Sequence, residues 1–564
     1  MKKIILSLLV ISSFNIIAQE KKSGLLYGSF ESNSQWYIND EINGREIKHP
    51  EDPFRSNNYL QLNYNYNKWT AGLQLESYAP NALLNYNPKY DETNVGTYFL
   101  NYKSNKIDAT AGYFYEQFGS GLILRTWEDR ALGINNALRG GRIKYSPIDD
   151  LTFIALYGKQ RTGFDVANSD IFGFNTEFNA SSLLNFEASD LSLGLSYVGR
   201  DEKTDVEKPK FESLTNAFSG RLNFSHNSFY ASTEYAYKSE EPVIINNSID
   251  NNFIKPGNAI LVNFGYSQKN LGIDATLRRM ENMSFYSERE PELYIDNNFS
   301  GGSTSYNFND KIVNYLPALT KQHHYNLANI YVYQVQKIDI PDPAIGKIGE
   351  IGGQFDIFYN FEKESALGGK YGTKVTVNIA NWYNLKGNYT YFPPSYNTEF
   401  FGSGKKYFSD YNIEITKKIN DKLQGNFVYV NQYVNQKFLQ GGSLVKTNIV
   451  AADATYKINK TQSVRLQGEH MWADADKKNW AGATLEFYYN PKLSFYVWDM
   501  YNYGNNKVGE GKVHYYNLGG SYRKGASRVA LNYGRQRGGL VCVGGVCRFV
   551  PESKGLSISL STSF

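Results

Sequence analysis

The chain has 564 residues, a formal net charge of +4 at pH 7 and a mean hydropathy of −0.49. A charge this close to neutral gives no case for nucleic-acid binding, and no run of 18 apolar residues is present to form a transmembrane helix. Aromatic residues nevertheless make up 15% of the chain, with 46 Tyr and 34 Phe. A polar average with many tyrosines is typical of an outer-membrane β-barrel, in which only every second strand residue contacts lipid.

The first residues have the order of features expected of a secretory signal peptide. Lys2 and Lys3 precede an apolar stretch at 4–10 that is too short to span a bilayer. We predict that residues 1–18 are removed and that residues 19–564 form a single barrel domain. Loss of the two lysines leaves the mature chain with a formal charge of about +2.

Alternating apolar and polar runs, such as YLQLNYNY (59–66) and FYASTEYAY (229–237), fill most of the remaining chain. Alternation with a period of two indicates β-strands with one apolar face. Asn, Asp, Gly or Pro residues mark short reversals between these runs. The predicted short turns lie at 66–71, 103–108, 146–150, 225–228, 267–270, 384–387, 419–422, 458–461, 489–492 and 522–527.

The alternating runs predict an all-β, transmembrane, antiparallel up-and-down barrel. Counting them gives about 26 strands, with 22 to 24 as the fallback, and an even number places both ends of the wall on the periplasmic side. The count includes strands at 326–337 and 386–392, and it assigns 363–370 to a loop outside the cell. A barrel this wide encloses a large lumen, which loops or another protein would have to fill.

The chain ends in GLSISLSTSF, where Leu556, Ile558, Leu560, Thr562 and Phe564 share one face and serines occupy the other. An amphipathic last strand with a terminal Phe resembles the assembly signal of bacterial outer-membrane barrels. It therefore predicts two contacts, with the outer-membrane assembly machinery and with outer-membrane lipid. The predicted location is the bacterial outer membrane, with the long loops facing outside.

The stretch GLILRTWEDRALGINNALRGGRIKY (121–145) differs from its surroundings. It holds four of the 18 arginines together with aliphatic residues that a free surface loop would not carry. We expect residues 117–138 to bend inward at Gly119 and Gly121, with about one helical turn in RALGINNAL. The lumen or constriction candidates are Glu116, Arg125, Trp127, Glu128, Asp129, Arg130, Arg139 and Arg142.

Two interpretations of these charges stay open. Glu116, Glu128 and Asp129 are expected to pair with the arginines, because Arg suits planar, bidentate pairing with carboxylates. The pairs would then form a structural network that braces a wide barrel. Alternatively, the segment is a constriction whose charges select solutes, and the two roles overlap.

Cys542 and Cys547 are the only cysteines and flank a Gly-Gly pair in the last loop. A disulfide is favoured in an oxidising envelope, because a two-cysteine metal site lacks further ligands. His323 and His324, and likewise Asp474 and Asp476, have no metal-site spacing, and they are interpreted as solvated loop residues.

Motifs for catalysis are missing from the sequence. It has no GxSxG, HExxH or phosphate-binding loop, and its six histidines form no recognisable nucleophile–base arrangement. We therefore predict a protein that is not an enzyme and that carries no cofactor or metal.

The start GLLYGSFESNSQWYIND (24–40), the segment YEQFGSGLILRTWEDRALGINNALRGGRIKY (115–145) and the terminal Phe together resemble the DUF6029 family of Bacteroidota outer-membrane proteins. This resemblance would cover the whole chain and implies a porin-like barrel, without a substrate or catalytic residues. YEQFGSGLILR is also distantly similar to the in-turned loops of alginate-export-type porins.

The leading functional prediction is a porin-like channel for solutes, narrowed by the loop at 117–138. The alternative is a sealed structural or partner subunit of a multi-protein outer-membrane assembly, such as a secretion or surface-protein complex. A protein partner in the envelope would belong to that alternative.

Overall fold

The computed structural model describes most of the chain. The described residues are 24–83, 90, 93–245, 248–296, 303–307, 311–337, 347–390, 393–439, 441–543 and 546–564. The signal peptide predicted at 1–18 lies outside them. Among the described residues, no helix has the length and hydropathy needed to cross a membrane.

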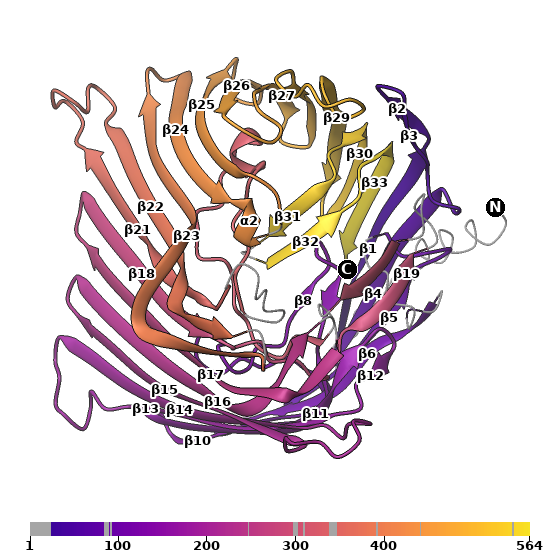
Figure 1. Cartoon of the computed structure of the whole chain (residues 1–564). Helices are drawn as coiled ribbons and strands as arrows, with labels where there is room; N and C mark the ends of the chain where they lie inside the picture. Colours follow the sequence, from indigo (N-terminus) through magenta and orange to yellow (C-terminus); the bar gives the residue numbers. More distant parts are fainter. Residues whose placement is uncertain are drawn as a thin grey trace.

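Twenty-four strands form one closed antiparallel sheet, which makes the wall of a barrel (Figure 1). In chain order the wall strands are β1 (Leu25–Ile38), β4 (Phe54–Tyr66), β5 (Trp69–Ser77), β6 (Thr93–Lys103), β7 (Ile107–Phe114), β10 (Leu138–Ile148), β11 (Leu151–Thr162), β13 (Asp170–Asn179), β14 (Ser189–Asp201), β15 (Leu214–His226), β16 (Phe229–Ile245), β17 (Ser248–Ser267), β18 (Leu271–Glu281), β21 (Glu350–Phe361), β22 (Thr373–Thr390), β23 (Ser395–Lys418), β24 (Leu423–Asn435), β25 (Leu444–Lys457), β26 (Ser463–Ala473), β27 (Trp480–Asn490), β28 (Leu493–Asn502), β29 (Val513–Lys524), β30 (Ser527–Gln536) and β33 (Ser553–Ser563).

Short elements lie in the connections between wall strands. They are β2 (Asp40–Ile42), β3 (Arg45–Ile47), β8 (Glu128–Asp129), β9 (Ile134–Asn135), β12 (Asp165–Val166), β19 (Glu292–Asp296), β20 (Ser303–Asn307), the 3₁₀ helix η3 (Leu327–Asn329), α2 (Gln436–Leu439), β31 (Gly539–Val543) and β32 (Val546–Val550).

The barrel closes where the first wall strand meets the last. β1 pairs with β33 from Ser29 opposite Ser563 onward. Gly28 and Phe564 exchange both backbone hydrogen bonds, at 2.9 and 3.0 Å. Every other wall strand pairs with its neighbours in chain order, so the sheet has no free edge.

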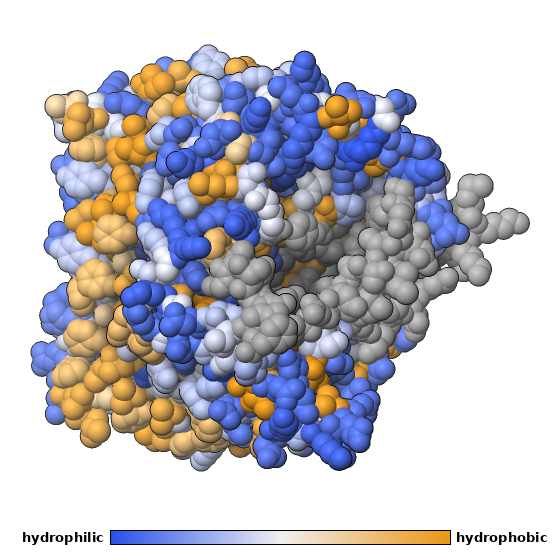
Figure 2. Space-filling view, viewed as in Figure 1, coloured by the Kyte–Doolittle hydropathy of each residue, from blue (hydrophilic) through white to orange (hydrophobic). Residues whose placement is uncertain are grey.

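Side chains alternate between the two faces of the wall. On β10, Ile143 and Tyr145 are 45% and 43% exposed on the outside, whereas Arg142, directly before Ile143, points inward. Figure 2 shows hydrophobic side chains gathered on the outer wall at the left and lower left of the view. The wall therefore has an apolar exterior, as contact with lipid requires.

The strand number of 24 corrects the count of 26 and falls within the fallback range. Residues 326–337 are not a wall strand, because they run inside the lumen. Residues 386–390 add no strand either, because β22 continues through the predicted turn at 384–387, with three register shifts against β23; the last two residues of that prediction, 391–392, lie outside the described residues. Asn and Gly suit such irregularities as well as turns.

This correction reverses part of the predicted topology. With two strands fewer, β21 and β22 run opposite to the expected directions, and 363–370 joins them at the rim predicted to be periplasmic. The other nine predicted turns connect wall strands at this same rim, which we call the short-turn rim. The opposite, long-loop rim carries the two connections that enter the lumen.

Candidate functional site

The connection from β7 to β10 folds into the barrel as a first inward segment, residues 115–137. Leu122, Ile123 and Leu124 are at most 2% exposed. They pack in one cluster with inward residues of β11 to β18, among them the small Ala217 and Ala236. The aliphatic residues of this segment therefore lie against the inner wall, while narrowing of a conducting path by it remains a prediction.

Two glycines bend the segment inward. Gly119 and Gly121 have φ values of +54° and +94°. A Cβ on Gly119 would lie only 2.3 Å from Cδ of Arg221 on the wall. The backbone could not come this close with any other residue.

The helical turn predicted in RALGINNAL is wrong. β8 and β9 form a small hairpin there instead. Asp129 accepts the backbone N–H of Leu132 at 3.0 Å, and Gly133 adopts a φ of +66° in the turn. Asp129 thus shapes the turn, and it forms no ion pair with an arginine among the described residues.

Arg130 joins the segment to the wall. It pairs with Glu128 at 3.1 Å and with Glu31 of β1 at 2.8 Å, and it stacks over the Tyr59 ring at 4.3 Å. Burial would lower the pKa of Arg130, but Glu128 and Glu31 outweigh it and leave the pKa raised. This guanidinium is therefore held in the charged form by its partners.

Arg142, on the inner face of β10, pairs with Glu116 and with Asp108, the latter at 3.2 Å. Arg139 lies on the opposite, outer face of the same strand, in line with Ile143. Alternation along β10 places these two candidates on different sides of the wall. Arg139 therefore does not face the lumen with the others.

Arg125 makes no ion pair among the described residues. Its guanidinium lies 3.8 Å from the ring centroid of Tyr315 and 5.4 Å from that of Trp127. The two rings meet edge to face, with centroids 5.4 Å apart. This arrangement is a cation–π contact that joins the segment to a distant part of the chain.

That distant part is a second inward segment, residues 311–337, whose lumenal position the sequence did not predict. It pairs with the first segment along the backbone: Arg125 N–H donates to Val313 at 2.8 Å, and Tyr315 N–H donates to Gly121 at 2.9 Å. Asn136 adds a side-chain bond to the carbonyl of Ile312 at 2.8 Å. The two segments therefore form one body inside the lumen.

Carboxylates of the wall hold the second segment. Tyr325 donates to Asp453 of β25 at 2.7 Å, and the backbone N–H of Leu327 donates to Glu469 of β26 at 2.8 Å. Burial raises the pKa of the Tyr325 hydroxyl, and Asp453 raises it further, so this donor stays protonated. Strand alternation predicts that Asp453 and Glu469 face inward, but no sequence pattern predicts which residues they contact.

Two residues interpreted from the sequence as solvated, His323 and Asp476, take part in contacts between the second inward segment and the rest of the barrel. His323 is buried and lies 2.8 Å from Asp410 of β23, whereas its neighbour His324 is exposed. Asp476 accepts the hydroxyl of Tyr331 at 2.9 Å, and Asp474 accepts the backbone N–H of Lys446 at 2.8 Å. The solvated interpretation is therefore wrong for His323 and Asp476.

A buried Arg–Glu pair also anchors the second segment. Glu350 of β21 is fully buried and lies 2.6 Å from Arg278 of β18. Its other oxygen accepts the hydroxyl of Tyr333 at 2.5 Å and the backbone N–H of Gln336 at 2.8 Å. All of these donors meet one carboxylate, which fixes the end of the segment.

A chamber of about 500 Å³ remains between this lumenal body and the wall. We call it the lumen chamber. Both inward segments, β1, β28 and the β30–β33 connection line it, through residues that include Tyr37, Leu132, His323, Tyr331, Trp498 and Arg537. Its volume lies in the range that holds small molecules.

Arg537 supplies the chamber with a cation. Its guanidinium donates a hydrogen bond to the Gly538 carbonyl at 3.4 Å, and among the described residues no carboxylate oxygen lies within 4 Å of it. Burial lowers the pKa of Arg537, and Tyr515 and Tyr331 oppose this by less. A cation at this position can attract an anion into the chamber.

Cys542 and Cys547 lie directly opposite each other in the two-stranded ribbon of β31 and β32. Opposed residues of an antiparallel pair are close enough for a disulfide. Their side chains lie outside the described residues, so the disulfide stays a prediction. In the part of the chain that is described, no group of three or more His, Cys, Asp or Glu residues could hold a metal ion.

The fold and the site together define a large up-and-down β-barrel with its own loops folded into the lumen. The chain belongs to DUF6029, a family of unknown function, whose model matches residues 1–564. No curated protein matches the sequence.

Several solved structures of outer-membrane barrels are similar. The siderophore receptor PirA from Pseudomonas aeruginosa has 10% identity and a TM-score of 0.40, covering 97% of this chain and 81% of the receptor. The P pilus usher PapC translocation pore has 8% identity and a TM-score of 0.43, covering 96% and 99%. The outer membrane protein OpdK from Pseudomonas aeruginosa has 10% identity and a TM-score of 0.36, covering 80% and 99%.

Proposed function

We propose that the protein is a solute channel of the bacterial outer membrane, narrowed by its two inward segments. Its signal peptide, residues 1–18, is removed during export. The strand ending in Phe564 engages the assembly machinery, and the long-loop rim faces outside. The apolar exterior of the closed wall supports the location, because such a barrel is stable only when lipid covers it.

One observation supports the channel most directly: the lumenal body does not fill the whole lumen, and the lumen chamber separates part of it from the wall. The chamber is bounded by both inward segments and by β1 and β28, so a solute that crosses the barrel here would contact the lumenal body and the wall together. Charged and aromatic side chains line it together, which suits a selective passage more than a general pore.

The sign of the selectivity follows from Arg537. The other charged side chains among the described lining residues are compensated, since Lys321 pairs with Glu414 at 3.0 Å and His323 lies against Asp410. The guanidinium of Arg537 has no such partner among the described residues. We therefore expect small anions to be favoured over cations.

A second candidate function has its own support. Both inward segments are pinned to the wall by buried side chains and carboxylates, and such anchoring favours a permanently sealed lumen. In that case the barrel is a structural or partner subunit of an outer-membrane assembly.

Planar-bilayer recording of the purified full-length protein separates the two. The channel predicts discrete openings, with a reversal potential in a KCl gradient that favours chloride. Arg537→Gln should reduce this anion preference about threefold to tenfold, while Lys524→Gln, at the exposed end of β29 on the short-turn rim, should not change it. A bilayer that stays silent with folded protein would exclude the channel and leave the sealed subunit.

A further inference from the structure

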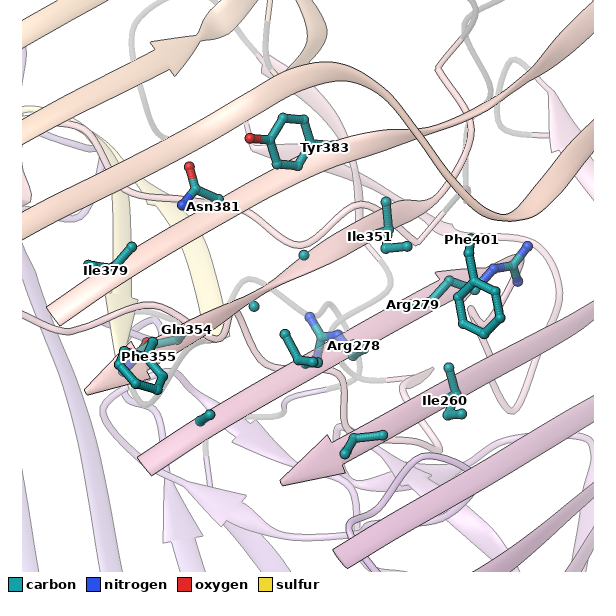
Figure 3. Close-up of a pocket in the computed structure, with 15 residues that line it drawn as sticks. Ile260, Arg278, Arg279, Ile351, Gln354, Phe355, Ile379, Asn381, Tyr383 and Phe401 are labelled. Carbon is teal, nitrogen blue, oxygen red and sulfur yellow. The ribbon is translucent and has the colours of Figure 1, made fainter. Parts of the chain in front are cut away.

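The outer wall carries a groove that the proposed channel does not use. It has a volume of about 590 Å³ and lies across β17, β18, β21 and β22. Figure 3 shows Ile260, Ile351, Phe355 and Ile379 among the side chains around it. The groove is on the outside, since the neighbouring Leu277 is 58% exposed on the lipid side of β18.

Small residues create this depression. Gly353 lies between Leu277 and Asn381 on adjacent strands, and Ala275 occupies the next outward position of β18. A Cβ on Gly353 would lie 2.3 Å from the carbonyl oxygen of Thr276, so no larger residue fits the present backbone. Isoleucine, leucine and phenylalanine side chains rise on either side of the small pair.

The tip of the β22–β23 hairpin bounds the groove toward the long-loop rim. Arg279 belongs to the outward row of β18, yet it is only 3% exposed, because its guanidinium donates to the carbonyl of Phe400 at 3.1 Å and to Thr398 at 3.1 Å. Glu281 pairs with it as well. Phe401, beside Arg279 in Figure 3, is 77% exposed over the groove. The tip thus removes a charge from the lipid face and adds an apolar side chain to it.

A lysine stands next to the groove at its long-loop end. Tyr383 lines the groove, and Lys406 is its partner on β23. The Lys406 ammonium lies 5.4 to 5.8 Å from the ring centroids of Tyr383, Tyr411 and Tyr433. Aromatic rings with a lysine among them are typical of the membrane interface, where headgroups lie. No carboxylate of the described residues lies within 4 Å of this ammonium.

We infer that the groove binds one anionic membrane lipid, with an acyl chain along Gly353 and Ala275 and its phosphate at Lys406. The bilayer covers this face of the wall, so the apolar part of the occupant is an acyl chain. The ammonium, set at interface depth, complements a negatively charged headgroup. The inference rests on the membrane location proposed above and does not depend on conduction.

Native mass spectrometry of the detergent-purified full-length protein tests it, with phosphatidylglycerol or phosphatidylcholine added. We expect one phosphatidylglycerol to remain bound under activation that strips phosphatidylcholine. Ala275→Phe should fill the groove and remove the adduct. Ala155→Phe should not, since Ala155 is an exposed outward residue of β11, away from the groove.

Lys406→Gln tests the headgroup separately, even if Ala275→Phe fails to fold. It should reduce the preference for phosphatidylglycerol about fivefold, which converts to ~1 kcal/mol, and Lys524→Gln should leave it unchanged. Equal lipid retention by wild type and a folded Ala275→Phe variant overturns the inference. A lipid-free dimer that Ala275→Phe dissociates also overturns it, and would assign the groove to a second copy of the chain. Both outcomes are independent of any bilayer current.

Discussion

The two inward segments occupy the same lumen but are held there in different ways. The first carries its own charges: Arg130 pairs with Glu128 of the same segment and also with Glu31 of the wall. The second contributes mainly hydroxyl and backbone donors, and the wall provides the carboxylates, such as Asp453 and Glu469. A loop therefore reveals a lumenal position in its own sequence only when it carries both members of its ion pairs.

The largest effect is expected from removing an anchor of the second segment. Glu350→Ala leaves the buried Arg278 without its carboxylate and frees Tyr333. We expect unfolding to be easier by ~3–5 kcal/mol, measured by tryptophan fluorescence during urea unfolding in lipid vesicles. Glu362→Ala, at an exposed pair with Lys269, should change the free energy by less than ~0.5 kcal/mol. Equal effects of the two changes would contradict the anchoring role of the wall.

A smaller loss is expected in the first segment. Arg130→Ala removes contacts to Glu31 and Glu128, but part of this network reaches solvent. The expected destabilisation is ~1–2 kcal/mol in the same unfolding experiment. Arg139→Ala serves as the matched control, because this arginine lies exposed on the outer face. If Arg139→Ala lowered the free energy of unfolding as much as Arg130→Ala, the ion pairs of Arg130 would not be what stabilises the first segment.

The junction between the segments should show a modest coupling. A double-mutant cycle of Arg125→Ala with Tyr315→Leu isolates their cation–π contact at 3.8 Å. We expect a coupling free energy of ~0.5–1 kcal/mol, and Arg125→Lys should retain part of it. Strictly additive losses would show that the two segments are stabilised independently.

The smallest effect is expected at the β31–β32 ribbon, which is a separate two-stranded sheet and not part of the barrel wall. Replacing Cys542 and Cys547 by serine should leave global unfolding within ~0.5 kcal/mol of the wild type, because the ribbon is a local unit. Without reductant, the wild-type cysteines should resist alkylation. Mass spectrometry would measure the mass that alkylation adds to the protein. Rapid labelling of both thiols would exclude the disulfide.

Most of the wall was predictable because its rules are local. A strand with one apolar face must alternate, and a reversal needs residues that tolerate a turn. The errors arose where a segment has the sequence pattern of a wall strand but folds into a different structure. Residues 326–337 also alternate, since Ile330, Val332 and Gln334 alternate with tyrosine and valine. They nevertheless do not pair with a wall strand, and side chains of the inner wall hold them inside the lumen.

The candidate site was predictable only in part. Clustered arginines marked the first segment, and Gly119 and Gly121 marked its bend. The lumen chamber was not predictable, because Tyr37, His323, Trp498 and Arg537 come from distant positions and meet only through closure of the barrel. Side-chain alternation gives the face of each residue, but not its partner across the lumen.

The seam between β1 and β33 makes closure of the barrel depend on contact between the two ends of the wall. Backbone bonds between Gly28 and Phe564 join positions at opposite ends of the wall, so the barrel has very non-local topology and its closure carries a large loop entropy. Until the last strand arrives, the sheet has two open edges that can pair with other chains. In the folded barrel the inward segments contact strands on both sides of the lumen. We expect these contacts to stabilise the curved form of the sheet as the barrel closes.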